Sequence, residues 1–169
     1  MISTATRSHT VLDSPVGPVV AVDEDGALVR LGTVATGSAF DPAACGERDD
    51  DVQPALREQL DAYWRGDLRD FDLALAPRGT PFQQRVWAAL RTIPFGTTWS
   101  YAQLAEEIGS PSAVRAVGAA NGRNPIWLVV PCHRVVGSDG KLVGYAGGLD
   151  VKRFLLDHER AALWQPSGA

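Results

Sequence analysis

The spacing of hydrophobic residues changes once along the chain, and this change constrains the fold more than any other feature. The first part of the chain holds short runs rich in β-branched side chains; these runs are His9 to Asp13, Val19 to Asp23 and Ala27 to Thr33. Such runs, separated by Pro-, Gly- and Asp-rich breaks, are typical of β-strands. From Thr80 onward the apolar residues recur three and four positions apart, as they do on one face of a helix. We therefore predict an α/β (α+β) fold, with a small strand-rich N-terminal α/β domain in residues 1–79 and a mainly helical C-terminal domain in residues 80–169.

The remainder of the N-terminal half is predicted to hold a hairpin turn, a loop, a helix and one more strand. The dipeptide Asp25-Gly26 favours a tight β-hairpin between the second and third runs. Residues 35–51 are rich in Gly, Ala and Asp and predict a surface loop, in which we expect Cys45 to be exposed. Apolar residues at helical spacing predict a helix over 52–64, and alternation over 71–75 predicts a strand.

Three helices are predicted in the first part of the C-terminal half. Thr80 and Ser100 are each followed three positions later by Gln, which is the pattern of a capping box at a helix start. A third helix, Ser112 to Ala120, follows a turn at Gly109-Ser110-Pro111, and this arrangement indicates a helix-turn-helix. The third helix is made of small residues, with Arg115 as its only charge. Its thin surface suits either close helix packing or entry into a nucleic-acid groove.

The formal net charge of −4 hides an asymmetry between the two halves of the 169 residues. Residues 1–79 hold 7 basic and 14 acidic side chains, a balance of −7, whereas residues 80–169 hold 9 and 6, a balance of +3. Such a difference favours an anionic partner for the C-terminal half.

Several functional classes are excluded by composition. The longest apolar run, Ile126 to Val130, is far shorter than the ~20 residues of a membrane span, so no membrane partner is expected. The N-terminus lacks a basic region followed by an apolar one, and we expect a reduced, cytoplasmic protein. Two cysteines and three histidines without metal-ligand spacing predict neither a metal site nor a cofactor.

The chemistry is concentrated at Cys132, which follows the predicted strand Ile126 to Val130. Its neighbours His133 and Arg134 are cationic or titratable, and cationic neighbours lower the pKa of a thiol. Adjacent side chains diverge, so a bridging water is expected to carry the thiol proton to His133.

A histidine that acts as a base needs an acceptor on its other nitrogen. Glu159 is the best candidate, although its spacing alone favours an ordinary solvated side chain. It lies in the final helix, whose packed face we predict to consist of Val151, Phe154, Leu155 and His158.

The motifs of residues 80–160 closely resemble those of the O6-alkylguanine-DNA alkyltransferases, also called methylated-DNA–protein-cysteine methyltransferases. The resemblance rests on Pro131-Cys132-His133-Arg134-Val135, Ser100-Tyr101, Arg115-Ala116-Val117-Gly118, Asn124-Pro125, Gly144-Tyr145-Ala146-Gly147-Gly148 and Leu155-Leu156-Asp157-His158-Glu159. It implies DNA repair by direct reversal, in which the protein is consumed by one alkyl transfer from O6 of guanine. The implied partner is double-stranded DNA that contains O6-alkylguanine, and O4-alkylthymine is a further substrate that the resemblance allows.

The resemblance also implies catalytic roles for four residues. Cys132 would be the nucleophile that takes the alkyl group in one in-line displacement. His133 would act on it through a water and would be oriented by Glu159. Asn124 would brace the turn that joins the recognition helix to the active-site loop.

Further implied roles concern DNA binding and the base pocket. Arg115 would enter the duplex in place of the extruded guanine, with Ala116 beside it on the thin helix that faces the minor groove. Tyr101 would crowd the 3′ phosphate and offer its hydroxyl to the departing base. Val135 and the loop at Tyr145 and Ala146 would line the pocket. We expect a monomer in solution, and the sequence leaves open whether molecules bind DNA cooperatively.

Trp127 is larger than the small or Pro residue expected two positions after Asn124-Pro125. We hypothesise that it narrows the entrance to the alkyl pocket and disfavours bulky adducts. Two other functional classes stay open: a non-catalytic alkyltransferase-like protein, against which the presence of Cys132 argues, and a Cys–His hydrolase, whose nucleophile and base are normally distant in sequence.

Overall fold

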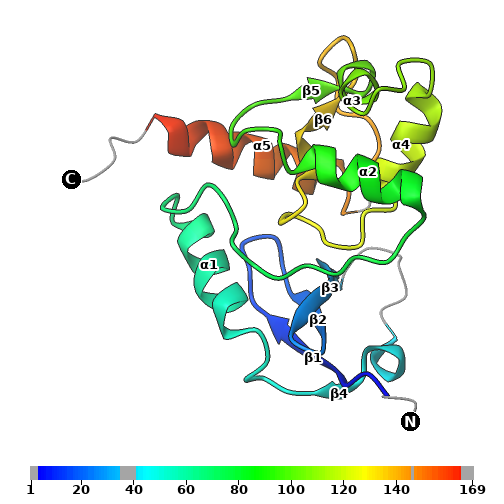
Figure 1. Ribbon diagram of the computed structural model, residues 1–169. Helices are drawn as coiled ribbons and strands as arrows, with labels where there is room; N and C mark the ends of the chain where they lie inside the picture. Colours follow the sequence, from blue (N-terminus) through cyan, green and yellow to red (C-terminus); the bar gives the residue numbers. More distant parts are fainter. Residues whose placement is uncertain (1–3, 35–40, 146, 165–169) are drawn as a thin grey trace. The chain divides into compact units, whose positions relative to one another are not determined.

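The computed structural model of the protein describes residues 4–34, 41–145 and 147–164. The chain forms two compact units, Met1–Arg78 and Gly79–Ala169. The first holds a sheet and one long helix, and the second is mainly helical (Figure 1). The predicted order of a strand-rich α/β part followed by a helical part is therefore confirmed.

The first unit is built on a four-stranded sheet with the strand order β3-β2-β1-β4. Its strands are β1 Arg7–Leu12, β2 Val19–Glu24, β3 Ala27–Thr33 and β4 Glu47–Arg48. The β1–β2 and β2–β3 pairs are antiparallel and the β1–β4 pair is parallel. Asp25 and Gly26 have φ of 53° and 88°, the positive values that a tight hairpin turn requires at both central positions. The three predicted strands and their hairpin are thus confirmed.

A short helical turn and a long helix complete the first unit. The turn η1, Pro42–Cys45, lies within the stretch predicted as loop; residues 35–40 of that stretch lie outside the described residues. The helix α1, Pro54–Trp64, buries Leu56, Leu60 and Tyr63 and confirms the predicted helix.

Two predictions for this unit are wrong. Cys45 is only 2% exposed, because η1 turns it into a cluster with Val20 and Val22. No strand forms over 71–75, where Leu75 makes one isolated bridge to Leu28. The amide of Gln59 on α1 instead bonds both the N–H and the C=O of Asp72, at 2.8 Å each, and so takes the place of a neighbouring strand.

The second unit contains the helices α2 Pro81–Leu90, α3 Tyr101–Glu107, α4 Val114–Gly122 and α5 Leu149–Leu163. Both predicted capping boxes are present, at the start of α2 on Thr80 and at the start of α3 on Ser100. Two short strands, β5 Trp99–Ser100 and β6 Val135–Val136, pair in parallel. The turn η2, Cys132–Arg134, directly precedes β6.

The helices α3 and α4 form the predicted helix-turn-helix. The small residues of α4 lie against α3, and a Cβ on Gly118 would be in ordinary van der Waals contact with the Tyr101 ring, at 3.7 Å. The indole N–H of Trp87 on α2 donates to the C=O of Ala120 at 2.9 Å. The opposite face of α4 exposes Arg115 and Ala116. Small residues thus serve packing on one face and leave a thin, singly charged surface on the other.

The packed face of α5 differs from the prediction. Its buried residues are Lys152, Leu155, Leu156, Glu159 and Ala162. Phe154, predicted to be buried, is 40% exposed, and Val151 and His158 are only partly buried. Two charged side chains occupy the buried face instead, because each has polar partners in the fold. Within the described parts of the chain, no helix is long and apolar enough to cross a membrane.

Candidate active site

A compact buried turn, and not the predicted strand, leads from Asn124 to Cys132. The N–H of Val129 donates to the C=O of Trp127 at 2.8 Å, and Leu128 between them has φ of 70°. A turn of this kind is the rarer, strained γ-turn. Strain in the backbone persists only where the surrounding structure imposes it, and such sites cluster at active sites.

A second tight turn places the cysteine itself. Pro131 has φ of −81° and ψ of 64°, and the N–H of Cys132 donates to the C=O of Val130 at 2.8 Å. These values define an inverse γ-turn. The chain then enters η2, so that Cys132, His133 and Arg134 leave a single helical turn in different directions.

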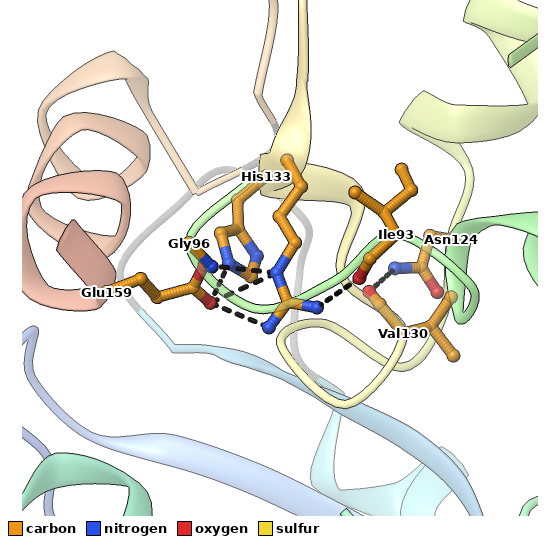
Figure 2. Close-up of polar contacts among 7 residues, drawn as sticks. Ile93, Gly96, Asn124, Val130, His133 and Glu159 are labelled. Atoms are coloured by element: carbon orange, nitrogen blue, oxygen red, sulfur yellow. Dashed lines mark hydrogen bonds and ion pairs between the residues drawn. The ribbon is translucent and has the colours of Figure 1, made fainter. Parts of the chain in front are cut away.

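Asn124 braces this whole segment from one side. Its Nδ2 donates to the C=O of Val130 at 2.8 Å, and its Oδ1 accepts from the N–H of Ile126 at 3.0 Å. Figure 2 shows the first of these bonds beside the carboxylate network. One side chain thus ties the beginning of the turn to its end, directly before the cysteine.

Burial dominates the environment of the Cys132 thiol, which is 6% exposed. Burial raises the pKa of Cys132, while the Asn124 amide, the Lys152 ammonium and the Tyr145 hydroxyl favour the thiolate without offsetting it. The expectation that Arg134 lowers this pKa is wrong, because its guanidinium is engaged elsewhere. The resting group is therefore a thiol that needs a base.

His133 is placed to be that base, and Glu159 holds it. Its Nε2 lies 2.8 Å from Oε1 of Glu159, and both side chains are fully buried (Figure 2). Burial lowers the pKa of His133 and outweighs the opposite effect of Glu159, so the imidazole is neutral. Because Nε2 faces a carboxylate, it carries the proton and Nδ1 keeps its lone pair. Nδ1 is buried and bonds no group among the described residues.

Arg134 compensates the buried charge of Glu159, a role that sequence reasoning missed. Its Nε and Nη2 donate to the carboxylate at 2.9–3.2 Å, and its Nη1 donates to the C=O of Ile93 at 2.7 Å. The N–H of Gly96 donates to Oε2 of Glu159 at 3.1 Å. Burial alone would raise the pKa of Glu159, but His133 and Arg134 together lower it to about 2. Glu159 is therefore ionised at neutral pH.

Lys152 is a second residue that sequence reasoning missed. It lies on the buried face of α5, its Nζ donates to the C=O of Val143 at 3.1 Å, and it sits 6.0 Å from the centre of the Tyr145 ring. Burial lowers the pKa of Lys152, and the nearby Cys132 opposes this effect. The available signal was a lysine in register with the buried Leu155 and Glu159 on one helical face.

Tyr101, at the start of α3, is another neighbour of Cys132. Its hydroxyl donates to the C=O of Val143 at 3.1 Å. Burial and the nearby Cys132 raise the pKa of Tyr101, whereas a hydrogen bond from Asn121 lowers it. The hydroxyl thus remains protonated and able to donate.

The structure brings together most of the residues predicted from the sequence, but not all. Cys132, Asn124, Tyr101 and Tyr145 converge on one place, and the His133–Glu159 pair adjoins it. Val135 is buried in β6 and Trp127 is buried in the strained turn. The other three are not among these contacts: Arg115 and Ala116 lie on the exposed face of α4, and Ala146 lies outside the described residues. Among the described residues, no group of three or more His, Cys, Asp or Glu side chains is placed to hold a metal ion.

Fold and site together define a class of protein: a helix-turn-helix unit that carries a buried cysteine next to an imidazole–carboxylate pair. The family model for the 6-O-methylguanine DNA methyltransferase DNA-binding domain matches residues 81–161. A methylated-DNA–protein-cysteine methyltransferase of Mycolicibacterium paratuberculosis is 49% identical over 90% of this chain and 92% of its own length. One of Methanosarcina acetivorans is 45% identical over 89% and 97%.

The likeness extends to three dimensions. The crystal structure of Mycobacterium tuberculosis OGT in complex with DNA superposes with a TM-score of 0.86 at 45% identity, covering 92% of this chain and 94% of that one. The chain belongs to the methylated-DNA–protein-cysteine methyltransferase family, whose members are methyltransferases of DNA repair.

Proposed function

We propose that the protein reverses alkylation damage by moving the alkyl group from O6 of guanine in duplex DNA onto Cys132, once and irreversibly. In this proposal residues 80–169 form the DNA-binding and alkyl-transfer domain. The observation that carries the proposal is the buried Cys132 thiol beside a neutral His133, whose Nε2 is fixed by the ionised Glu159.

The proposed reaction begins with removal of the thiol proton. Because Nδ1 of His133 keeps its lone pair, it accepts that proton through a bridging water. The thiolate then attacks the alkyl carbon opposite O6, forming the S–C bond while the C–O6 bond breaks. The electron pair of the C–O6 bond leaves with guanine, and the proton that His133 accepted is available to neutralise the departing base. A thioether does not release its alkyl group, so each molecule acts once.

Three residues would bring the base to the thiol. The O6 atom lies inside the base stack, and rotating a nucleotide out costs a few kcal/mol. Arg115, exposed on the thin face of α4 with Ala116, fits the role of filling the gap in the duplex. The protonated Tyr101 hydroxyl beside Cys132 fits the role of a donor to the departing guanine.

The base pocket and the cellular setting belong to the same proposal. The pocket would be lined by Val135, Tyr145, Ala146 and Trp127, and O4-alkylthymine is a second substrate to test.

The protein would act as a monomer in solution. A thiol that must stay reduced and a DNA substrate both fit a cytoplasmic location. Association that depends on a modest excess of basic residues would weaken with rising salt.

Incubation with duplex DNA carrying radiolabelled O6-methylguanine tests the proposal. Label should move to the protein up to one equivalent and then stop. Cys132→Ser should abolish the transfer, and the matched control Cys45→Ser, at the other cysteine, should retain it. Release of label into solution with repeated turnover would refute the suicide-acceptor reaction and favour a hydrolase. Binding without transfer by the unaltered chain would favour a non-catalytic alkyltransferase-like function.

A further inference from the structure

Trp127 carries a hydrogen-bond donor that the fold leaves unused. The side chain is 5% exposed, and its indole Nε1 has no hydrogen-bond partner among the described residues. A buried N–H without a partner costs roughly 1–3 kcal/mol. Most buried donors in native proteins are paired, and an exception calls for an explanation. The other buried tryptophan of this unit follows the rule, since Trp87 donates to Ala120.

The indole nitrogen of Trp127 lies close to Gly147 and Tyr145, beside the active-site cysteine's own neighbour. A Cβ on Gly147 would lie 3.6 Å from Nε1 of Trp127 and 2.9 Å from the ring of Tyr145, so the two rings meet over this glycine. The hydroxyl of Tyr145 in turn lies near enough to Cys132 to favour its thiolate, which lowers the pKa of the thiol. Tyr145 is therefore a neighbour of both the donor and the thiol.

The backbone keeps Trp127 in this position. Its C=O accepts from Val129 across the strained turn at Leu128, and the turn is tied down by Asn124. A side chain fixed in this way cannot easily swing its N–H toward another acceptor. The Trp127 backbone is thus held in a neighbourhood that it shares with Cys132 through Tyr145.

We propose that the Trp127 N–H is a specificity determinant. It donates a hydrogen bond to an oxygen of the O6 substituent that lies beyond the carbon attacked by the Cys132 sulfur. The inference rests on the proposed function and deepens it by naming a substrate class. Adducts with an acceptor oxygen, such as 2-hydroxyethyl, react faster than hydrocarbon adducts of equal size, such as n-propyl. A purely hydrocarbon group of that size leaves the N–H unpaired, which is the basis of the discrimination.

The test compares transfer rates from duplexes that carry O6-(2-hydroxyethyl)guanine or O6-propylguanine. The two substituents have the same number of heavy atoms and are both neutral. For each protein the hydroxyethyl rate is divided by the propyl rate, which removes any general loss of activity. Trp127→Phe keeps an aromatic ring but lacks the N–H. The control Trp164→Phe alters an exposed indole at the end of α5.

The ratio should be about fivefold lower in Trp127→Phe than in the parent, the effect of one net neutral hydrogen bond. It should be unchanged in Trp164→Phe. Equal ratios in the parent and Trp127→Phe, with transfer intact, would overturn the inference and mean that the N–H only packs against the Tyr145 ring. Failure of the parent to transfer any group would instead refute the proposed function.

A second measurement needs no substitution. The indole N–H resonance of Trp127 in ¹⁵N-labelled protein should lie further downfield when Cys132 carries a 2-hydroxyethyl group than when it carries a propyl group. Identical positions in the two products would contradict the inference.

Discussion

Replacing Glu159 by Gln should destabilise the protein strongly at neutral pH and progressively less in acid. The carboxylate is fully buried, accepts from Arg134 and Gly96, and faces the Nε2 of His133. Gln keeps the shape but not the charge, so the buried guanidinium of Arg134 loses its counter-ion. Removing one partner of a buried pair costs about 3–5 kcal/mol.

The pKa of Glu159 gives a second, independent value for the stability that its carboxylate contributes. The fall from 4.5 to about 2 on folding corresponds to about 3 kcal/mol of stability at neutral pH. Because the folded-state pKa is the lower one, this stability is fully present above pH 4.5. It is lost progressively as the pH falls from 4.5 through 2, and below pH 2 the carboxyl group is protonated in both states. The difference between parent and Glu159→Gln should therefore shrink to about 1 kcal/mol at pH 3.

Urea unfolding followed by tryptophan fluorescence, at a series of pH values from 7 to 3, measures this difference. Asp157→Asn is the matched control, because Asp157 is an exposed carboxylate on the same helix. The control should change the free energy of unfolding by less than about 0.5 kcal/mol at every pH. A cost for Glu159→Gln that does not vary with pH would show that folding does not lower the pKa of Glu159.

Further predictions concern four other side chains. Arg115→Ala should leave the melting temperature unchanged. It should slow transfer from duplex DNA by about tenfold or more, given a flipping cost of a few kcal/mol, but should not slow transfer from free O6-benzylguanine. An equal loss of rate with both substrates would contradict a role in the duplex. Trp127→Ala should raise the rate ratio of O6-benzyl- to O6-methylguanine if the indole narrows the pocket, and an unchanged ratio would reject that hypothesis. Lys152→Met should move the midpoint of iodoacetamide alkylation of Cys132 to higher pH, because the buried ammonium favours the thiolate; an unmoved midpoint would exclude that effect. Thr80→Ala should lower the free energy of unfolding by about 1 kcal/mol in urea titrations through loss of the α2 cap, and no loss would show that the capping box is not stabilising.

Features fixed by neighbouring residues were predictable from the sequence. The capping boxes at Thr80 and Ser100 and the hairpin at Asp25-Gly26 depend on a few consecutive residues, and all three occur as predicted. The segment Ile126 to Val130 was misjudged as a strand for the opposite reason. Its tight turn requires a positive φ at Leu128, which nothing local favours and which the contacts of Asn124 impose.

The candidate site shows the same division between local and distant causes. Cys132 and His133 could be singled out as candidate site residues because they are adjacent in the sequence. The direction of Arg134 could not, because it depends on where α5 places Glu159. The buried face of α5 was predicted around Phe154, since apolar residues are normally buried. The fold instead buries Lys152 and Glu159, whose partners come from segments distant in the sequence.

The central claim is that Cys132 accepts the alkyl group of the lesion. Its most direct test is mass spectrometry of proteolytic peptides after incubation with a duplex that contains O6-methylguanine. The account predicts that the peptide with Cys132 gains one methyl group, stoichiometrically with the lesions repaired, while the peptide with the buried Cys45 is unmodified. A methyl group on Cys45 or another residue, or repaired DNA with an unmodified Cys132, would contradict it.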